Sequence, residues 1–264
     1  MSRAIVITSG KGGVGKSTLT VTIGRILSEM DKKVVIVDAD FGLNNIDLLM
    51  NLENAVVYDI IDVAENRCRI SQALLRDGES KSLFVLPSAH AYDKSALDGQ
   101  SLRAIVTALK SRFDFVLIDS PAGIEYGFHR AVSAADEALI VTTPHLSALQ
   151  DAEKVAALIK PYELKTVTVA LNRARGDMEK SGDAVSRLDV EQYLGLKVSG
   201  VIPDEDTLNM LSTTSSAIKR GSDGHRAVSM LCEFITKGTG EIYDPSKRYR
   251  GVIGALKRKL RKII

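Results

Sequence analysis

The sequence lacks the signals of several protein classes. It has two cysteines, Cys68 and Cys232, in 264 residues, and neither belongs to a CxxC pair, so a disulfide scaffold and a cysteine metal site are not expected. No run of about 18 apolar residues occurs that could span a membrane. The opening segment, MSRAIVITSG, has no charged region followed by an apolar core and a cleavage site, as a signal peptide would. These absences predict a reduced, cytoplasmic protein.

An excess of one charge is also missing. Lys and Arg number 35 against 33 Asp and Glu, and aromatic residues make up only 5% of the chain. A nearly neutral protein has no long-range field that attracts nucleic acid, so no nucleic-acid partner is expected. Hydrophobic residues nonetheless account for 45% of the sequence, as in ordinary globular proteins.

Short β-branched runs alternate with longer helical stretches. The runs are Ala4–Thr8, Val34–Val37, Leu83–Leu86, Phe115–Ile118, Ala138–Thr142, Thr166–Leu171 and Val198–Ile202. The helical stretches between them include Lys16–Met30, Ser101–Arg112, Ala148–Lys160 and Gly224–Thr236. Runs that are apolar almost throughout suit strands covered on both faces, so the pattern predicts an α/β fold with a doubly wound, mainly parallel sheet flanked by helices. A shift in composition predicts a domain over residues 1–240, a linker over 241–248 and a terminal segment over 249–264.

A glycine-rich loop follows the first predicted strand. Residues 10–17 read GKGGVGKS, which satisfies the phosphate-binding pattern G-x-x-x-x-G-K-[ST] between a strand and a helix. Such a loop turns backbone N–H groups onto phosphate oxygens, its lysine reaches the β- and γ-phosphates, and its hydroxyl binds Mg²⁺. The predicted nucleotide-binding residues here are Gly10, Lys11, Gly12, Gly13, Val14, Gly15, Lys16, Ser17 and Thr18. A glycine-rich turn that matches by chance is the plain alternative.

Carboxylates end two other predicted strands. Asp38 and Asp40 follow one apolar run, and Asp119 follows another after four apolar residues, the Walker B arrangement. Ligands of α/β sheets bind at the carboxyl ends of the strands. We therefore predict that Ser17 and Asp119 hold Mg²⁺, with Asp119 acting through water or the Ser17 hydroxyl. An N-cap of the following turn is the alternative for Asp119.

The last sixteen residues, 249–264, have the pattern of an interfacial helix. As a helix, their apolar residues fall within an arc of about 120° and most cations occupy the rest. The residues predicted to bind anionic lipid are Val252, Ile253, Leu256, Lys257, Arg258, Leu260, Arg261, Ile263 and Ile264. The alternatives are a helix that packs on its own domain and a segment that binds nucleic acid. The lack of an aromatic residue among the cations argues against nucleic acid.

Lys11, the loop's additional lysine, carries a resemblance. With Lys11 beside the first glycine, the loop resembles that of the deviant Walker A, or ParA–MinD, family of ATPases. The resemblance implies that ATP and Mg²⁺ are the cofactors and that Lys11 reaches the nucleotide of a second subunit in a homodimer. It implies further that Asp40 positions the attacking water and helps to hold Mg²⁺, with Asp38 in support. Lys11, Lys16 and Asp40 are then the catalytic residues, and Ser17, Asp38, Asp40 and Asp119 are the metal set. A solvated loop lysine is the alternative for Lys11.

Other segments extend the resemblance and its implications. Gly123, in the second switch at residues 119–123, is expected to offer its N–H to the γ-phosphate. Asn172 and Arg173 are expected beside the adenine, and Pro203 and Asp204 are expected to wall it. An asparagine at a strand end is often only a turn former.

The match is good to the septum-site-determining branch of this family. Residues 119–125, DSPAGIE, and the segment 41–47, FGLNNID, carry it. The departures are Asn44 in place of an expected arginine, Ser17 in place of threonine, and the segment 211–217, LSTTSSA. Ser17 keeps the hydroxyl of threonine. The other two departures fall where members of the family contact partners or the second subunit, so partner identity is less firmly implied than ATP hydrolysis.

The resemblance implies an ATPase that dimerises with ATP, associates with the cytoplasmic face of the membrane, and places the division site. Its partners would be anionic lipids, a division inhibitor of the MinC type, and either a MinE-type activator or a DivIVA-linked system. Two alternatives stay open: a flagellar-placement ATPase of the FlhG type and a ParA-type ATPase of DNA partition.

Overall fold

The computed structural model describes residues 2–41, 45–89, 97–206, 208 and 218–249. Its strands are β1 (Arg3–Thr8), β2 (Val34–Asp38), β3 (Leu75–Arg76), β4 (Leu83–Leu86), β5 (Phe115–Asp119), β6 (Glu137–Thr142), β7 (Thr166–Ala174) and β8 (Val198–Pro203). Its α-helices are α1 (Lys16–Glu29), α2 (Asn45–Leu49), α3 (Ile60–Ala64), α4 (Ile70–Ala73), α5 (Gly99–Lys110), α6 (Tyr126–Ser133), α7 (Leu146–Ile159), α8 (Gly176–Ser181), α9 (Arg187–Leu194) and α11 (Asp223–Lys237). Short 3₁₀ turns lie at η1 (Glu53–Ala55), η2 (Lys160–Tyr162) and η3 (Lys247–Tyr249).

The strands form one sheet in the order β3-β4-β2-β5-β1-β6-β7-β8. Every pairing is parallel except that of β3 with β4. The seven apolar runs of the sequence are strands of this sheet, so the predicted doubly wound α/β fold is confirmed. The two-residue strand β3, at the edge, was not predicted.

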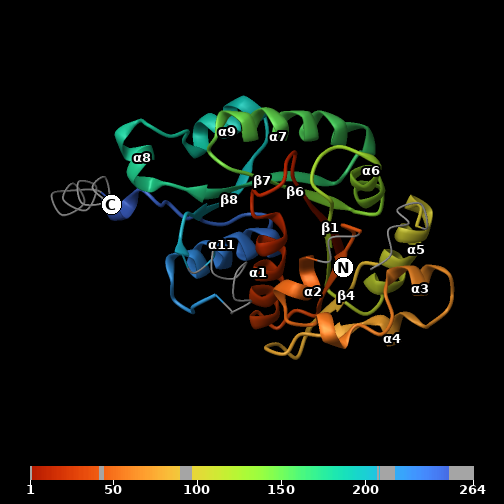
Figure 1. Cartoon of the computed structure of the whole chain (residues 1–264). Helices are drawn as coiled ribbons and strands as arrows, with labels where there is room; N and C mark the ends of the chain where they lie inside the picture. The colour runs from red at the N-terminus through yellow and green to blue at the C-terminus, as the bar shows by residue number, and fades with distance from the viewer. Residues whose placement is uncertain (1, 42–44, 90–96, 207, 209–217, 250–264) are drawn as a thin grey trace.

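Alternation along the strands divides the core into two layers. On one face Val6, Val37 and Ile118 pack in a cluster with residues of α5, α6 and α7. On the other face Ile7 and Ile36 pack in a cluster with residues of α1 and α11. Figure 1 shows these two groups of helices on opposite sides of the sheet. Such two-sided burial explains why the strands are apolar throughout.

The register brings the carboxyl ends of the central strands together. Asp38 at the end of β2 pairs with Asp119 at the end of β5, and Asp119 pairs with Ile7 near the end of β1. The loop after β1 runs directly into α1. The fold therefore places the phosphate-binding loop and two carboxylates at one edge of the sheet.

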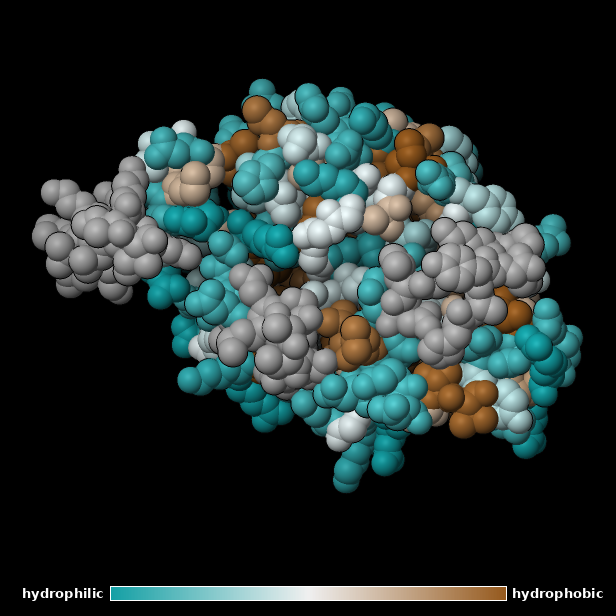
Figure 2. Space-filling view, in the orientation of Figure 1, coloured by the Kyte–Doolittle hydropathy of each residue, from teal (hydrophilic) through white to brown (hydrophobic). Residues whose placement is uncertain are grey.

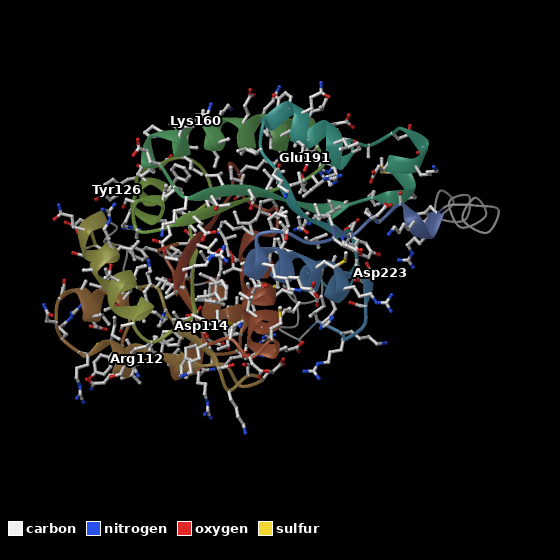
Figure 3. The ribbon with its side chains drawn as sticks, turned by 180° about the vertical axis from the view of Figure 1, so that it is seen from behind. Arg112, Asp114, Tyr126, Lys160, Glu191 and Asp223 are labelled. Atoms are coloured by element: carbon white, nitrogen blue, oxygen red, sulfur yellow. The ribbon has the colours of Figure 1, made fainter. Side chains whose placement is uncertain are left out.

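Residues 241–249 pack on the α/β domain. Gly176 lies so close to this segment that an added Cβ would meet the Pro245 carbonyl oxygen at 2.2 Å. Arg248 donates to Asp223 at the start of α11, and Figure 3 labels Asp223. Tyr249, the first apolar residue of the predicted interfacial helix, instead ends η3 and is 6% exposed. The division at residue 240 stays a prediction, but the predicted linker makes close contacts.

The remainder of the predicted interfacial helix lies outside the described residues. That covers Val252, Ile253, Leu256, Lys257, Arg258, Leu260, Arg261, Ile263 and Ile264. Asn44 and the segment 211–217 also lie outside them. Within the described part of the chain, no helix has the length and apolar character needed to cross a membrane.

Candidate nucleotide-binding site

The glycine-rich loop encloses space suited to phosphate. Gly13 and Gly15 have φ of 78° and 87°, a conformation that side chains disfavour. An added Cβ at Gly12 or Gly13 would meet nothing within 4 Å, whereas one at Gly10 would meet the Asp151 backbone of α7 at 2.4 Å. The loop therefore lies against α7 on one side and borders open space on the other.

That open space is a cavity of about 340 Å³ at the start of α1. Its lining includes most of the predicted nucleotide-binding and catalytic residues, namely Lys11, Gly12, Gly13, Val14, Gly15, Lys16, Ser17, Thr18 and Asp40. Ser9, Asn45, Leu48, Leu49 and Ala122 complete it. Backbone N–H groups at a helix N-terminus favour an anion in this position.

A hydrogen-bond network forms the floor of the cavity. Lys16 Nζ lies 3.2 Å from Asp119 Oδ1, and Ser17 Oγ donates to Asp119 Oδ2 at 2.7 Å. Thr20 Oγ1 donates to Asp119 Oδ1 at 2.9 Å. Asp119 is 0% exposed and Lys16 is 6% exposed, so this ion pair is buried. We refer to Lys16, Ser17, Thr20 and Asp119 as the floor.

Two further carboxylates lie behind the floor. Asp38 Oδ1 accepts from the Asp40 N–H at 3.0 Å, and both residues are at most 9% exposed. Burial and the neighbouring Asp119 raise the pKa of Asp38 to about 8. The crowding of buried carboxylates around Lys16 thus disfavours the charged form of Asp38, an environment that a divalent cation would reverse.

The residues present fit Mg-ATP. Mg²⁺ usually takes one or two protein oxygens and completes its shell with water and substrate phosphates. Among the described residues, no three Asp, Glu, His or Cys side chains converge on a metal site. Ser17 and Asp119, 2.7 Å apart, supply the two oxygens that a nucleotide-borne Mg²⁺ requires. The direct metal roles of Asp38 and Asp40 stay predictions.

The side predicted for the base is nearly closed. Asn172, Arg173 and Pro203, with Gly15 and Thr18, line a cavity of only about 20 Å³, far smaller than a purine. Asn172 Nδ2 donates to the Val14 carbonyl at 2.8 Å, so its amide holds the loop itself. Asp204, by its backbone N–H, donates to the Ala174 carbonyl at 3.1 Å and lies outside this small cavity's lining. Adenine would enter here only if these side chains move.

Two residues with predicted contacts to ATP contact their own chain. The Gly123 N–H, predicted to reach the γ-phosphate, donates to the Ser9 carbonyl at 3.0 Å. Lys11 Nζ, predicted to reach a second subunit, donates to Ser147 Oγ at the start of α7, at 3.1 Å. Both bonds would have to break for the predicted roles, and a neutral partner at an exposed site holds a lysine weakly, by about 1 kcal/mol.

Large apolar side chains are exposed on the segments beside the cavity. Leu48 of α2, which lines it, is 59% exposed, and Leu146, next to Ser147, is 73% exposed. Ile124 and Tyr126, which follow the second switch, are 41% and 60% exposed. We refer to Lys11 and these four residues as the rim. Figure 2 shows brown apolar groups interrupting the mostly teal surface near the middle of the drawn face.

Thr20 and Ser147 were not predicted as site residues. Thr20 lies four residues after Lys16 on α1, so the helix repeat alone places the two side chains on one face. That spacing could have identified Thr20. Nothing in the local sequence connects Ser147 to Lys11, because 136 residues separate them.

Comparison with known proteins bears on the family. The model of a family described as AAA domain matches residues 2–171. A septum site-determining protein MinD from Synechocystis sp. is 43% identical over 208 residues, which cover 79% of this chain and 78% of that protein. The MinD of Helicobacter pylori is 38% identical over 268 residues, 97% of this chain and 98% of the relative.

Solved structures agree with these relatives. The MinC:MinD cell division protein complex of Aquifex aeolicus contains a chain that is 37% identical, with a TM-score of 0.84 over 91% of this chain and 97% of that one. MinD of Pyrococcus horikoshii, solved with Mg-ADP, is 29% identical with a TM-score of 0.81 over 90% and 97%. A ParA family ATPase from Chlorobium tepidum, 22% identical with a TM-score of 0.75 over 89% and 98%, shares the fold. Given this identity over most of its length, the chain belongs to the MinD family of Mg-dependent septum site-determining ATPases.

Proposed function

We propose that this chain places the cell division site as an ATP-driven switch between a free monomer and a membrane-associated homodimer. The observation that carries the proposal is the contrast between two lysines of one loop. Lys16 is buried in the floor, whereas Lys11 lies in the rim, and the described hydrogen-bond partner of its ammonium is a single hydroxyl. One lysine serves the phosphates of its own chain, and the other is available to those of a second chain.

The rim supports dimerisation. Large exposed apolar side chains on segments that border the cavity have the composition expected of an interface. ATP bound in the cavity would add phosphate charge for the partner's Lys11 to contact. Hydrolysis would remove that charge and release the dimer.

Membrane association would come from the amphipathic pattern of residues 249–264. One interfacial helix of this length binds lipid weakly and reversibly. A dimer carries two such segments, and joining two weak anchors raises avidity by about 10²–10⁴ without any new contact. The nucleotide state would thereby control a peripheral position on the cytoplasmic face of the membrane.

The proposed partner is a division inhibitor of the MinC type. Its support is the resemblance to a chain of the Aquifex aeolicus MinC:MinD complex and to septum site-determining relatives. The same resemblance favours division-site placement over the flagellar and DNA-partition alternatives. A MinE-type activator and a DivIVA-linked system both remain compatible with the sequence.

Vesicle co-sedimentation tests the switch. With vesicles containing anionic lipid, the protein should pellet with Mg-ATP and stay in the supernatant with Mg-ADP. Replacing both Ile253 and Leu256 with Glu should abolish pelleting, because each buried aliphatic side chain contributes roughly 1.5–3 kcal/mol. Neutralising Lys257, Arg258 and Arg261 should weaken it by about 1 kcal/mol per charge, in a salt-dependent manner.

The controls separate the alternatives. The Ile253/Leu256 double variant should keep wild-type ATP affinity and thermal stability. A large drop in its melting temperature would instead support a helix that packs on its own domain. Binding of DNA but not of vesicles in ATP would contradict the proposal and favour partition.

A further inference from the structure

Arg130 is a buried arginine close to the cavity but outside its floor and rim. It lies on α6, the helix that follows the second switch, and is 4% exposed. Burial lowers its pKa from the usual value, yet a guanidinium stays charged because that value is so high. A buried charge is costly unless its surroundings hold it, so its contacts matter.

These contacts lie on both sides of Asp40. Arg130 Nη2 donates to the Ala39 carbonyl at 3.3 Å, and the guanidinium carbon lies 3.9 Å from the centre of the Phe41 ring. Nη1 donates to the Leu97 carbonyl at 3.1 Å. Tyr126, one turn earlier on α6 and labelled in Figure 3, lies 6.0 Å away on the same guanidinium. Arg130 thus contacts the residues immediately before and after Asp40.

The hydrogen bond to Ala39 fixes a peptide plane. The Ala39 carbonyl and the Asp40 N–H belong to one planar peptide group. Arg130 holds its oxygen, and Asp38 Oδ1 accepts from its N–H at 3.0 Å. The preceding Ala39 N–H donates to the Asp119 carbonyl at 3.0 Å. The backbone that enters Asp40 is therefore held by three groups. One comes from the floor, one from α6, and one from the first switch, which is the Asp-x-Asp segment 38–40 at the end of β2.

The geometry points to Arg130 as a positioning residue that orients Asp40 for ATP hydrolysis and links the two switches. This inference rests on the proposed role of Asp40 in hydrolysis. Because Arg130 lies on the helix after Gly123, any shift of that helix on nucleotide binding moves the guanidinium that holds Asp40. Arg130 is not among the residues that line the cavity, so its effect should fall on turnover and not on nucleotide affinity.

Substitution of Arg130 tests this assignment. Arg130→Met should lower kcat by about 10- to 100-fold, since an error of about 1 Å in placing a catalytic group can cost 10²-fold. Its Kd for ATP should change by less than about threefold, because that much corresponds to under 1 kcal/mol. Arg130→Lys, which keeps the charge and one donor, should restore part of kcat.

A matched control is available on α1. Arg25 is also a buried arginine, 7% exposed, and its ion-pair partners are Asp77, at 3.3 Å, and Glu79, at 3.8 Å, neither of which lines the cavity. Arg25→Met should destabilise the fold to a similar degree and leave kcat at the wild-type level. Equal kcat losses in Arg25→Met and Arg130→Met would show a general effect of destabilisation and overturn the inference.

A double-mutant cycle with Asp40→Ala completes the test. If Arg130 acts through Asp40, Arg130→Met should lower kcat no further in the Asp40→Ala background. A full additional loss there would contradict positioning. If Asp40→Ala itself hydrolyses ATP at the wild-type rate, the proposed role of Asp40 fails. If Asp40→Ala is slow while Arg130→Met and Arg130→Lys are normal, only the inference about Arg130 fails.

Discussion

The floor and the rim of the cavity differ in polarity and in burial. The floor is polar and buried, and its Lys16, Ser17 and Thr20 all point at one carboxylate within 3.2 Å. The rim is apolar and exposed, and the Lys11 ammonium makes a single described hydrogen bond there, to a neutral hydroxyl. A buried polar network is stable only when its groups are paired, whereas an exposed apolar surface gains free energy when something covers it.

This difference separates what one chain does from what two chains do. The floor contains the charges needed to bind Mg-ATP within a single subunit. The rim contains exposed apolar groups that the second subunit of the proposed homodimer would cover. Changes in the floor should therefore affect nucleotide binding and turnover, and changes in the rim should affect association first.

The largest expected effect comes from breaking the floor. Lys16→Ala removes the buried cation that faces the phosphates and leaves Asp119 without its ion-pair partner. Charged hydrogen bonds contribute about 1.5–3 kcal/mol each, so ATP affinity should fall by about 100-fold or more in calorimetry. Lys154→Ala, at an exposed lysine paired with Asp151 on α7, is the control and should bind normally. Undiminished ATP affinity in Lys16→Ala would refute its role.

A smaller and more selective effect is expected from changing Asp40, which lines the cavity beside the floor. Asp40→Ala should keep ATP binding and dimerisation but hydrolyse ATP about 100-fold more slowly, within the range for loss of a general base. Phosphate release measures the rate. Asp114→Ala is the control, because this exposed carboxylate, labelled in Figure 3, directly precedes β5 and so lies at the opposite end of that strand from Asp119. A wild-type rate in Asp40→Ala would mean that another group positions the water.

The smallest effect is expected on the rim. Ser147→Ala removes the described hydrogen-bond partner of Lys11 without touching the floor. Since an exposed hydrogen bond to a neutral hydroxyl contributes about 1 kcal/mol or less, the association constant for dimerisation in ATP should rise by no more than about fivefold for each of the two bonds removed. ATP affinity of the monomer should not change. A loss of dimerisation in this variant would mean that Ser147 itself contributes to the interface.

Much of this architecture could be predicted from the sequence because it is local. Each parallel strand is a continuous apolar run, and the glycine-rich loop fixes its own shape between β1 and α1. The strand β3 could not be predicted, since two residues carry no period. Thr20 could have been identified from its position four residues after Lys16 on α1, once Lys16 had been assigned to the phosphate site.

Contacts distant in sequence could not be predicted. Arg130 and Ala39 are 91 residues apart, and Lys11 and Ser147 are 136 apart. The sequence around these residues contains no pattern that indicates either contact. Tyr249 illustrates the same limit. An amphipathic pattern predicts which face of a helix is apolar, but it does not predict which surface buries that face, and Tyr249 is buried in the domain.

The molecular mass in solution with Mg-ATP tests the contrast between floor and rim most directly. The chain is 28.6 kDa, and Asp40→Ala, which should retain ATP, should show twice that mass by light scattering in Mg-ATP and the monomer mass in Mg-ADP. The Lys11→Ala/Asp40→Ala double variant should bind ATP equally well and stay monomeric. An ATP-dependent dimer of that double variant would contradict the account, because Lys11 would then have no role across the interface.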